Sequence, residues 1–456
     1  MKKINPEKIR SGLFFGLRWT KEFFSEFIHL FSRKEKYLSI IFIAALIVSG
    51  GFLFYQKYLS VTKEAPNNGG TYTEGVIAKS KDDLTDTVNR LTKIGLTKFD
   101  EAGNIVPAAA SSWQVSDDVK TYTFTIDKKF SRDEILAMLD RQKDKWPGIE
   151  IKPQDEDKII FRFNDSYSPF LASTTLPVLN YGPYKLSESN SSQFKFVANS
   201  QYYLGKPYID QIIIKIYPDK ENLDKAYKEG QVNGVYLADN TDKFSQSNIY
   251  SFKLPRYNML FFNTQREALK DSLVRKKIAN GEKFDNELKL VMVILDTEKN
   301  RIIANDIIQK WQKQNINITA IYKNPTELID VIIPKRDYDV LIYGLDYGVD
   351  PDPYPFWHST QASSIGLNLS NFSNIDADKA LEEARKTLNK DTRKQKYDEF
   401  WKIFNDEVPA IILSQDEWKF AVGKKIKNVQ TGYSITPEDR YLKVDKWYIN
   451  TKRVKK

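Results

Sequence analysis

The longest hydrophobic run lies near the amino terminus. Between Lys36 and Lys57 the chain has twenty uncharged residues, YLSIIFIAALIVSGGFLFYQ. A helix of this length can cross the hydrocarbon core of a bilayer. The run therefore predicts a transmembrane helix over residues 37–58, with a leader before it (residues 1–36) and a short linker after it (residues 59–70).

The charge of the leader predicts how the helix is oriented. Residues 1–36 carry nine Lys or Arg against four Glu, so the leader is expected to stay cytoplasmic and the rest of the chain to lie outside the cell membrane. A cleaved signal peptide is the alternative, and the 36-residue leader disfavours it. Within the leader, Ile9 to Phe31 is amphipathic; it could lie on the inner leaflet or contact a membrane partner, with His29 as a bystander.

Beyond residue 70 the polar and apolar positions alternate as in strands, with single helices between them. A hairpin is expected at Trp113–Ile126 and a helix at Ser131–Gln142, with Ser131 and Glu134 at the spacing of a capping box. From residue 287 the pattern becomes regular. Strands are expected at Leu288–Leu295, Ile316–Tyr322 and Tyr338–Tyr343, with a helix at Thr297–Gln314 and a shorter one, capped by Asn324, through Ile333. Such a βαβαβ order is typical of an α/β fold with a parallel sheet and right-handed crossovers.

An acidic, aromatic loop follows the third of these strands, in the sequence YDVLIYGLDYGVDPDPYPFWHS. Its prolines exclude a helix or a central strand. Ligands of parallel sheets bind outside the carboxyl ends of the strands, where this loop begins. The loop is therefore a candidate ligand site, and the candidate contact residues are Asp346, Tyr347, Tyr343, Trp357 and Asp350. Asp352 is expected to form a turn, and His358 to be structural. Two helices are expected after the loop: Asp376–Asn389, with apolar residues at helical spacing from Ala377 to Leu388, and a second one capped by Asp391 that ends before Pro409.

Composition removes several classes of function. The chain has no cysteine and only two histidines, which excludes disulfides and cysteine nucleophiles and disfavours zinc sites and histidine-based triads. The formal net charge of +9 is concentrated in the leader, so no nucleic-acid surface is expected. No cofactor, metal ion or catalytic residue is predicted.

Four ordered blocks resemble the family 5 extracellular solute-binding proteins, the oligopeptide, dipeptide and nickel type that serve ABC importers. The first is GLTKFDEAGNIVPAAASSWQVSDDVKTYTFTI, from Gly95. The second joins YGPYKLSE to ANSQYYLGKPYIDQIIIKIYPD, and the third is LPRYNMLFFNTQREALKDSLVRKKI. The fourth runs from the acidic loop to Leu413.

The resemblance implies a periplasmic-binding-protein fold of the cluster C type, with two lobes of mixed and parallel sheets that close on a ligand. Lobe I would be discontinuous, residues 71–255 and 415–456, including a small subdomain at about 96–176; lobe II would be residues 256–414. The implied function is capture of a small solute, most plausibly an oligopeptide, and its delivery to an ABC permease. The implied protein is a receptor and not an enzyme.

The resemblance also implies roles for the loop. Asp346, in the Asp-Tyr motif, would pair with the amino group of a bound peptide, and Tyr343, Tyr347 and Trp357 would form apolar or stacking walls. The chain departs from the family in lacking the lipid-anchor cysteine, for which the transmembrane helix would substitute. It also lacks the usual aromatic-His-Asp-Gly segment after Ile126, which should make the lobes smaller.

Two other functions are compatible with the sequence. A non-transport surface receptor or scaffold could keep the fold without tight solute binding. A carboxylate-based hydrolase or a hard-cation site could be built from Asp346, Asp350 and Asp352, but no second carboxylate at a facing position and no metal-binding loop supports it.

Overall fold

The computed structural model describes residues 32–142, 148–237, 244, 247–430 and 432–456. The predicted amphipathic segment from Ile9 to Phe31, with His29, lies outside the described residues. The chain divides into two compact units, residues 1–67 with 451–456, and residues 68–450.

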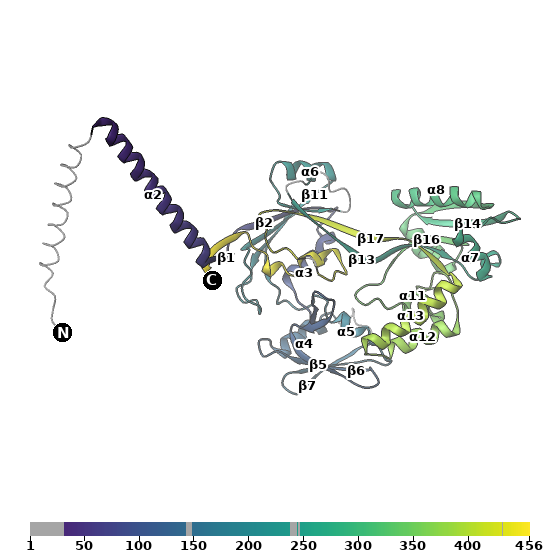
Figure 1. Ribbon diagram of the computed structural model, residues 1–456. Helices are drawn as coiled ribbons and strands as arrows, with labels where there is room; N and C mark the ends of the chain where they lie inside the picture. Colours follow the sequence, from purple (N-terminus) through teal and green to yellow (C-terminus); the bar gives the residue numbers. More distant parts are fainter. Residues whose placement is uncertain (1–31, 143–147, 238–243, 245–246, 431) are drawn as a thin grey trace. The chain divides into compact units, whose positions relative to one another are not determined.

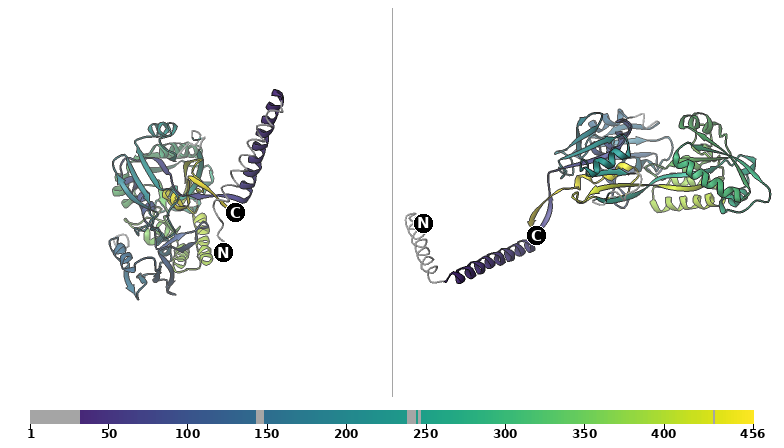
Figure 2. Two further views of the ribbon diagram at one scale, coloured as in Figure 1. Left: turned by 90° about the vertical axis from the view of Figure 1, so that its left-hand side faces the viewer. Right: turned by 90° about the horizontal axis from the view of Figure 1, so that it is seen from above.

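The smaller unit contains the predicted membrane helix. Helix α2 (Arg33–Val61) is capped by Ser32 and Glu35, which exchange hydrogen bonds in a capping box. It is an unbroken helix (Figure 2), long and apolar enough to span a bilayer. The predicted linker contains strand β1 (Thr62–Asn67), which pairs with β18 (Asn450–Lys455). The carboxyl-terminal tail is therefore a strand. The Arg453 guanidinium also contacts β1, because it donates hydrogen bonds to Thr62 Oγ1 at 2.8 Å and to Thr62 O at 2.9 Å.

The larger unit is built around one ten-stranded sheet (Figure 1). The strand order begins with β15 (Ile316–Lys323), β14 (Leu288–Leu295), β16 (Val340–Asp346), β13 (Ser247–Phe262) and β17 (Ala410–Gly423), and it continues with β12 (Gly234–Leu237), β2 (Thr71–Ile77), β11 (Gln211–Tyr217), β10 (Gln193–Ala198) and β9 (Tyr184–Ser189).

The predicted βαβαβ unit is confirmed. Strand β14 pairs in parallel with both β15 and β16. Helix α8 (Glu298–Lys313) connects β14 to β15 and packs Ala304, Ile307 and Trp311 onto the same core as the strands. After β15 the chain forms a short helical segment, α9 (Pro325–Glu327) to α10 (Ile333–Lys335), begun by Asn324 as expected. The apolar spacing of the sequence therefore gave the correct element order here.

Strands β13 and β17 are the longest in the sheet, and they pair along most of their length. The first part of β17 lies beside the second part of β13, which also pairs with β16. Between Lys253 and Tyr257 the β13–β17 register shifts. This irregularity falls at the boundary expected between the lobes, after residue 255. The lobe boundaries themselves remain a prediction.

A second, four-stranded sheet lies within the expected subdomain, in the order β5 (Ala110–Val115), β6 (Thr121–Ile126), β8 (Lys158–Arg162) and β7 (Glu150–Gln154). The predicted hairpin of β5 and β6 is confirmed. Helix α4 (Arg132–Asp140) begins after Ser131, whose hydroxyl accepts the Glu134 N–H. The expected capping box is incomplete, because the Glu134 carboxylate instead accepts the Tyr181 hydroxyl at 2.6 Å.

Two helices follow the acidic loop. Helix α12 (Ile375–Arg385) buries Ala377, Ala380, Leu381 and Ala384, as its pattern predicted. Helix α13 (Lys390–Glu407) buries Phe400 and Phe404. Asp391 was expected to cap α13, and this was wrong: Asn389 Oδ1 accepts the N–H groups of Asp391 and Thr392. Asp391 lies in the first turn, where its charge complements the helix dipole.

Candidate functional site

Asp346 is the last residue of β16 and lies directly across from Arg256 of β13. Its carboxylate accepts a hydrogen bond from the Arg256 guanidinium at 2.6 Å and another from the Gly348 N–H at 2.8 Å. The two side chains remain 45% and 36% exposed. A surface pair of this kind contributes little to stability. Asp346 therefore has an ion-pair partner within the protein, but a ligand cation could replace Arg256 with little loss of stability.

The other two carboxylates of the acidic loop, of which Asp352 is buried and Asp350 mostly buried, are held by arginines of the following helices. Asp350 pairs with Arg393 at 2.9 Å, and Asp352 with Arg385 at 2.6 Å. Burial raises the pKa of the Asp350 carboxyl, and Arg393 opposes that shift. Both arginine side chains are themselves mostly buried. These contacts fix the loop onto α12 and α13.

The aromatic residues of the loop lie largely in the core. Trp357, in the short helix α11 (Tyr354–Trp357), is 0% exposed and stacks with Phe261 at 5.8 Å. Its indole N–H donates to the Tyr347 hydroxyl at 2.9 Å. Tyr343 and Tyr347 are partly buried and pack against the same cluster. In this structure Trp357 has no surface that a ligand could contact, and its predicted role, like those of the two tyrosines, stays a prediction.

His358 is buried beside the loop. Its ring stacks on Tyr354 with centroids 4.1 Å apart, and Nδ1 lies 2.8 Å from Thr360 Oγ1. Within the described ranges, no three His, Cys, Asp or Glu side chains gather as metal ligands would. The side chains of the loop are therefore mostly packed or ion-paired within the protein.

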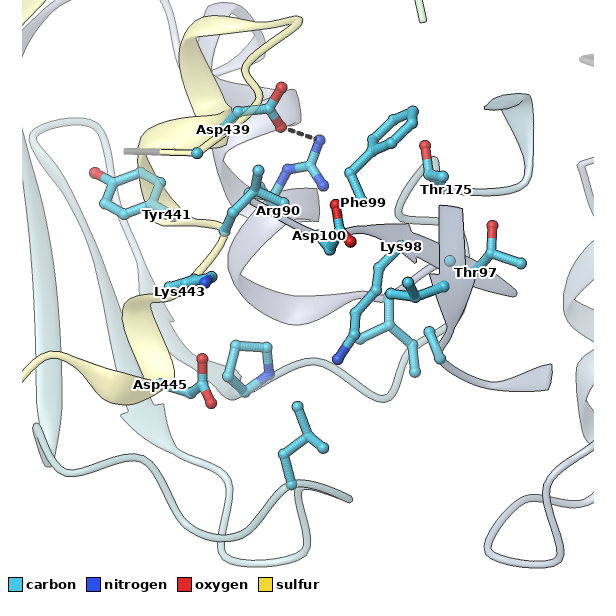
Figure 3. Close-up of a pocket in the computed structure, with 18 of the residues that line it drawn as sticks. Arg90, Thr97, Lys98, Phe99, Asp100, Thr175, Asp439, Tyr441, Lys443 and Asp445 are labelled. Atoms are coloured by element: carbon cyan, nitrogen blue, oxygen red, sulfur yellow. Dashed lines mark ion pairs between the residues drawn. The ribbon is translucent and has the colours of Figure 1, made fainter. Parts of the chain in front are cut away.

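A cavity with a volume of about 600 Å³ lies elsewhere in the same unit. This is within the range of small-molecule sites. Its walls come from residues 90–108, 175–204 and 428–446, and Val349 contributes to them from the acidic loop. None of the five predicted contact residues lines it. The cavity, shown in Figure 3, is therefore next to the loop but formed by other parts of the chain.

Lys98 enters this cavity from strand β3 (Thr97–Phe99), which pairs with β4 (Ile105–Pro107). Thr97 is 0% exposed and its hydroxyl lies 2.6 Å from that of Thr174, which fixes the strand. Side chains alternate along a strand, so Lys98 points the opposite way. Figure 3 shows it reaching toward the wall that carries Lys443 and Asp445.

Lys98 has little compensation for its charge. Its hydrogen-bond partner is the Tyr203 hydroxyl, at 3.4 Å. Across the described residues, no carboxylate forms an ion pair with it within 4 Å. Burial lowers the pKa of the Lys98 ammonium, and the nearby Asp445 carboxylate partly offsets this. Lys443 and Lys446 lower it further. The cavity therefore holds a half-buried cation without a close counterion.

Most other charges on the walls are paired. Arg90 of α3 (Thr85–Thr92) lies 2.5 Å from Asp439, drawn as a dashed line in Figure 3. Lys443 pairs with Glu101. Asp445 is 7% exposed, and its Oδ2 lies 3.3 Å from the Lys446 ammonium, though outside hydrogen-bond geometry. Val444 and Trp447, close to Asp445 in the chain, are both 0% exposed.

Aromatic side chains supply the apolar part of the lining. Tyr202 and Tyr203 meet edge to face, with ring centroids 4.9 Å apart. Burial raises the pKa of Tyr203 to about 12, so its hydroxyl stays protonated at neutral pH. Phe99 contacts Tyr433, with centroids 5.0 Å apart. The cavity can thus hold an anionic group at Lys98 and apolar groups against these rings.

Sequence reasoning gave no role to Lys98, Tyr203 or Asp445. They lie in three segments more than a hundred positions apart, and only the fold brings them together. The one local signal is Lys98 itself, a lysine within the apolar stretch IGLTKF.

The chain is similar in sequence to known proteins. Residues 146–281 match the family model for bacterial extracellular solute-binding proteins, family 5 Middle. The "Oligopeptide-binding protein AppA" of Bacillus subtilis (strain 168) is 20% identical over 90% of this chain and 98% of its own length. The "Nickel-binding periplasmic protein" of Escherichia coli (strain K12) is 27% identical over 44% of this chain and 49% of its own.

Solved structures share the fold. The ABC transporter substrate binding protein CtaP from Listeria monocytogenes superposes with a TM-score of 0.70 at 19% identity, covering 84% of this chain and 100% of its own. The AppA structure from Bacillus subtilis in complex with a nonapeptide gives a TM-score of 0.61 at 16% identity, with 85% and 100% covered.

Proposed function

Because this chain belongs to the family 5 extracellular solute-binding proteins, we propose that it is a membrane-tethered receptor that captures a small solute for an ABC importer. The proposed solute is an oligopeptide. Relatives named for peptides, and a solved relative of the same fold in complex with a nonapeptide, support this choice.

The observation that carries the proposal is the cavity of about 600 Å³ beside the acidic loop. It combines aromatic walls with charged groups, as solute sites do. Asp346 lies three residues from Val349 of the lining. We keep Asp346 as a contact for a ligand ammonium, because its pair with Arg256 is exposed and a carboxylate can accept more than two hydrogen bonds.

The proposed tether is α2, retained as a single transmembrane helix with the leader in the cytoplasm and residues 68–450 outside. The basic leader supports this orientation. Closure on the ligand would bend β13 and β17 at the register shift between Lys253 and Tyr257, since a hinge needs a few residues whose backbone is not fixed by regular pairing.

Thermal denaturation of the full chain in detergent, against a mixed-sequence tripeptide library, tests the proposal. A ligand present at a hundred times its dissociation constant should stabilise the protein by about 2.7 kcal/mol. An unchanged unfolding temperature with every peptide fraction would contradict peptide capture.

One observation favours the scaffold alternative: Asp346, Asp350 and Asp352 all have arginine partners within the protein. A pure scaffold should purify without bound solute. Native mass spectrometry of the detergent-solubilised chain separates the two functions, because a receptor should carry a small molecule that is lost on mild unfolding.

A further inference from the structure

Among the described residues that line the cavity, Lys98 is a cation with no carboxylate oxygen within 4 Å of its ammonium. Three other basic side chains of the lining form ion pairs within the protein: Arg90 with Asp439, Lys443 with Glu101, and Lys446 with Asp445. Lys98 is instead half-buried, directed into the cavity, and hydrogen-bonded only weakly to a neutral phenol at 3.4 Å. A half-buried ammonium that a nearby carboxylate compensates only in part is costly, and an anionic ligand group would reduce that cost.

We propose that Lys98 is the anion anchor of the site and that it receives the terminal carboxylate of the bound peptide. The inference rests on the proposed function, and it names the end of the solute that this cavity would hold. The charge-assisted hydrogen bond from the lysine ammonium to a carboxylate is stronger than the bond to Tyr203 that it would replace.

The surroundings of Lys98 favour a carboxylate over a neutral group. Lys443 and Lys446 add positive potential from the opposite wall, while Asp445 is the carboxylate close enough to affect Lys98. Asp445 is 7% exposed, so it presents little surface to a ligand. The Tyr203 hydroxyl, which stays protonated, can donate to the second carboxylate oxygen. Tyr202 and Phe99 would then contact the last side chain of the peptide.

A structural role for Lys98 is the competing explanation. Its ammonium lies 5.7 Å from the centroid of the Tyr203 ring, a cation–π distance. Such a contact would make Lys98 a packing residue, whose removal changes stability but not the choice of ligand. The two roles therefore differ in ligand selectivity.

The test uses one mixed-sequence tripeptide library made twice, with free carboxyl termini and with carboxyl-terminal amides. Retention on the full chain is measured by native mass spectrometry for wild type, Lys98→Met, Lys98→Arg and Lys185→Met. Lys185 is an exposed lysine of β9 outside the cavity and serves as the matched control. Unfolding curves without ligand verify that each variant is folded.

We expect wild type and Lys185→Met to retain free acids at least tenfold better than amides. Lys98→Met should lose that preference, and Lys98→Arg should keep most of it. If amides and free acids bind wild type equally, the anchor is refuted while peptide capture stands. If neither library binds, both the anchor and peptide capture are refuted.

Discussion

The acidic loop and the cavity next to it both display charged and aromatic side chains, yet they use them differently. In the loop, Asp350 and Asp352 are paired with arginines of α12 and α13, and Trp357 is 0% exposed. In the cavity, Lys98 keeps a charge that no close carboxylate balances among the described residues. The residue types of a segment show which contacts with a ligand it could make. Whether a group is already paired decides whether it is available to a ligand.

The largest expected effect concerns Trp357. Replacement by alanine should lower the free energy of unfolding by about 3–5 kcal/mol, because it removes a large, fully buried ring that packs on Phe261 and Phe404. Urea denaturation of the variant measures this. A loss below about 1 kcal/mol would mean that the loop is not part of the core.

Arg385→Met should come next, at about 3 kcal/mol, because it leaves the buried Asp352 carboxylate without its partner. Lys98→Met is the matched comparison and should change stability by about 0.5 kcal/mol or less, since it removes a charge that has no close carboxylate partner. Equal losses of unfolding free energy for the two variants would contradict the difference between the paired charges of the loop and the unpaired charge of the cavity.

Arg256→Met tests the exposed pair at the edge of the loop. Its cost in stability should be below about 1 kcal/mol, because both side chains are partly exposed. If Asp346 contacts a ligand ammonium, the variant should bind free-amine peptides more tightly than wild type and N-acetylated peptides unchanged. Titration calorimetry with a matched pair of such peptides measures this.

The pH dependence of binding is the smallest of the expected effects. Burial lowers the pKa of Lys98 below its ordinary value of 10.5, so the ammonium loses its proton within a window that ends near that value. The preference for free acids should decrease as pH rises through this window. Without ligand the sign is opposite: the unfolded chain binds more protons there, so the Lys98 contribution to stability increases with pH.

Lys98→Arg is the control for this pH series, since a guanidinium stays charged throughout. A wild-type preference that stays flat up to pH 10.5 would contradict the role of the Lys98 ammonium, and one that declines equally in Lys98→Arg would assign the titration to another group. The charged groups that act on Lys98 are Asp445, Lys443 and Lys446, and only the carboxylate has an ordinary pKa far below the window.

Much of the fold was predictable because it is local. The twenty-residue apolar run predicted α2, and the alternation after residue 287 predicted the β14–α8–β15 unit and its parallel pairing with β16. The cap of α13 was harder to predict, because neighbouring polar side chains compete for the free N–H groups of the first turn. Asn389, and not Asp391, accepts them. The strand formed by the carboxyl-terminal tail was missed, because its partner β1 lies nearly four hundred positions away.

The candidate site was predictable only in part. The acidic loop stood out by composition, but its arginine partners come from helices about thirty to forty residues later, and no sequence pattern indicates that pairing. The cavity draws Lys98, Tyr203 and Asp445 from three distant segments. No local pattern could have joined them, because the cavity exists only once the sheet and the carboxyl-terminal segment have folded together.

The most direct test follows the Lys98 ammonium by NMR in the full chain, with lysines reductively ¹³C-methylated and the Lys98 signal assigned by its absence in Lys98→Arg. Addition of the free-acid tripeptide library should shift this signal and raise its apparent pKa, while the amide library should leave it in place. A Lys98 signal that stays unchanged while free acids bind would contradict the assignment of the anion anchor.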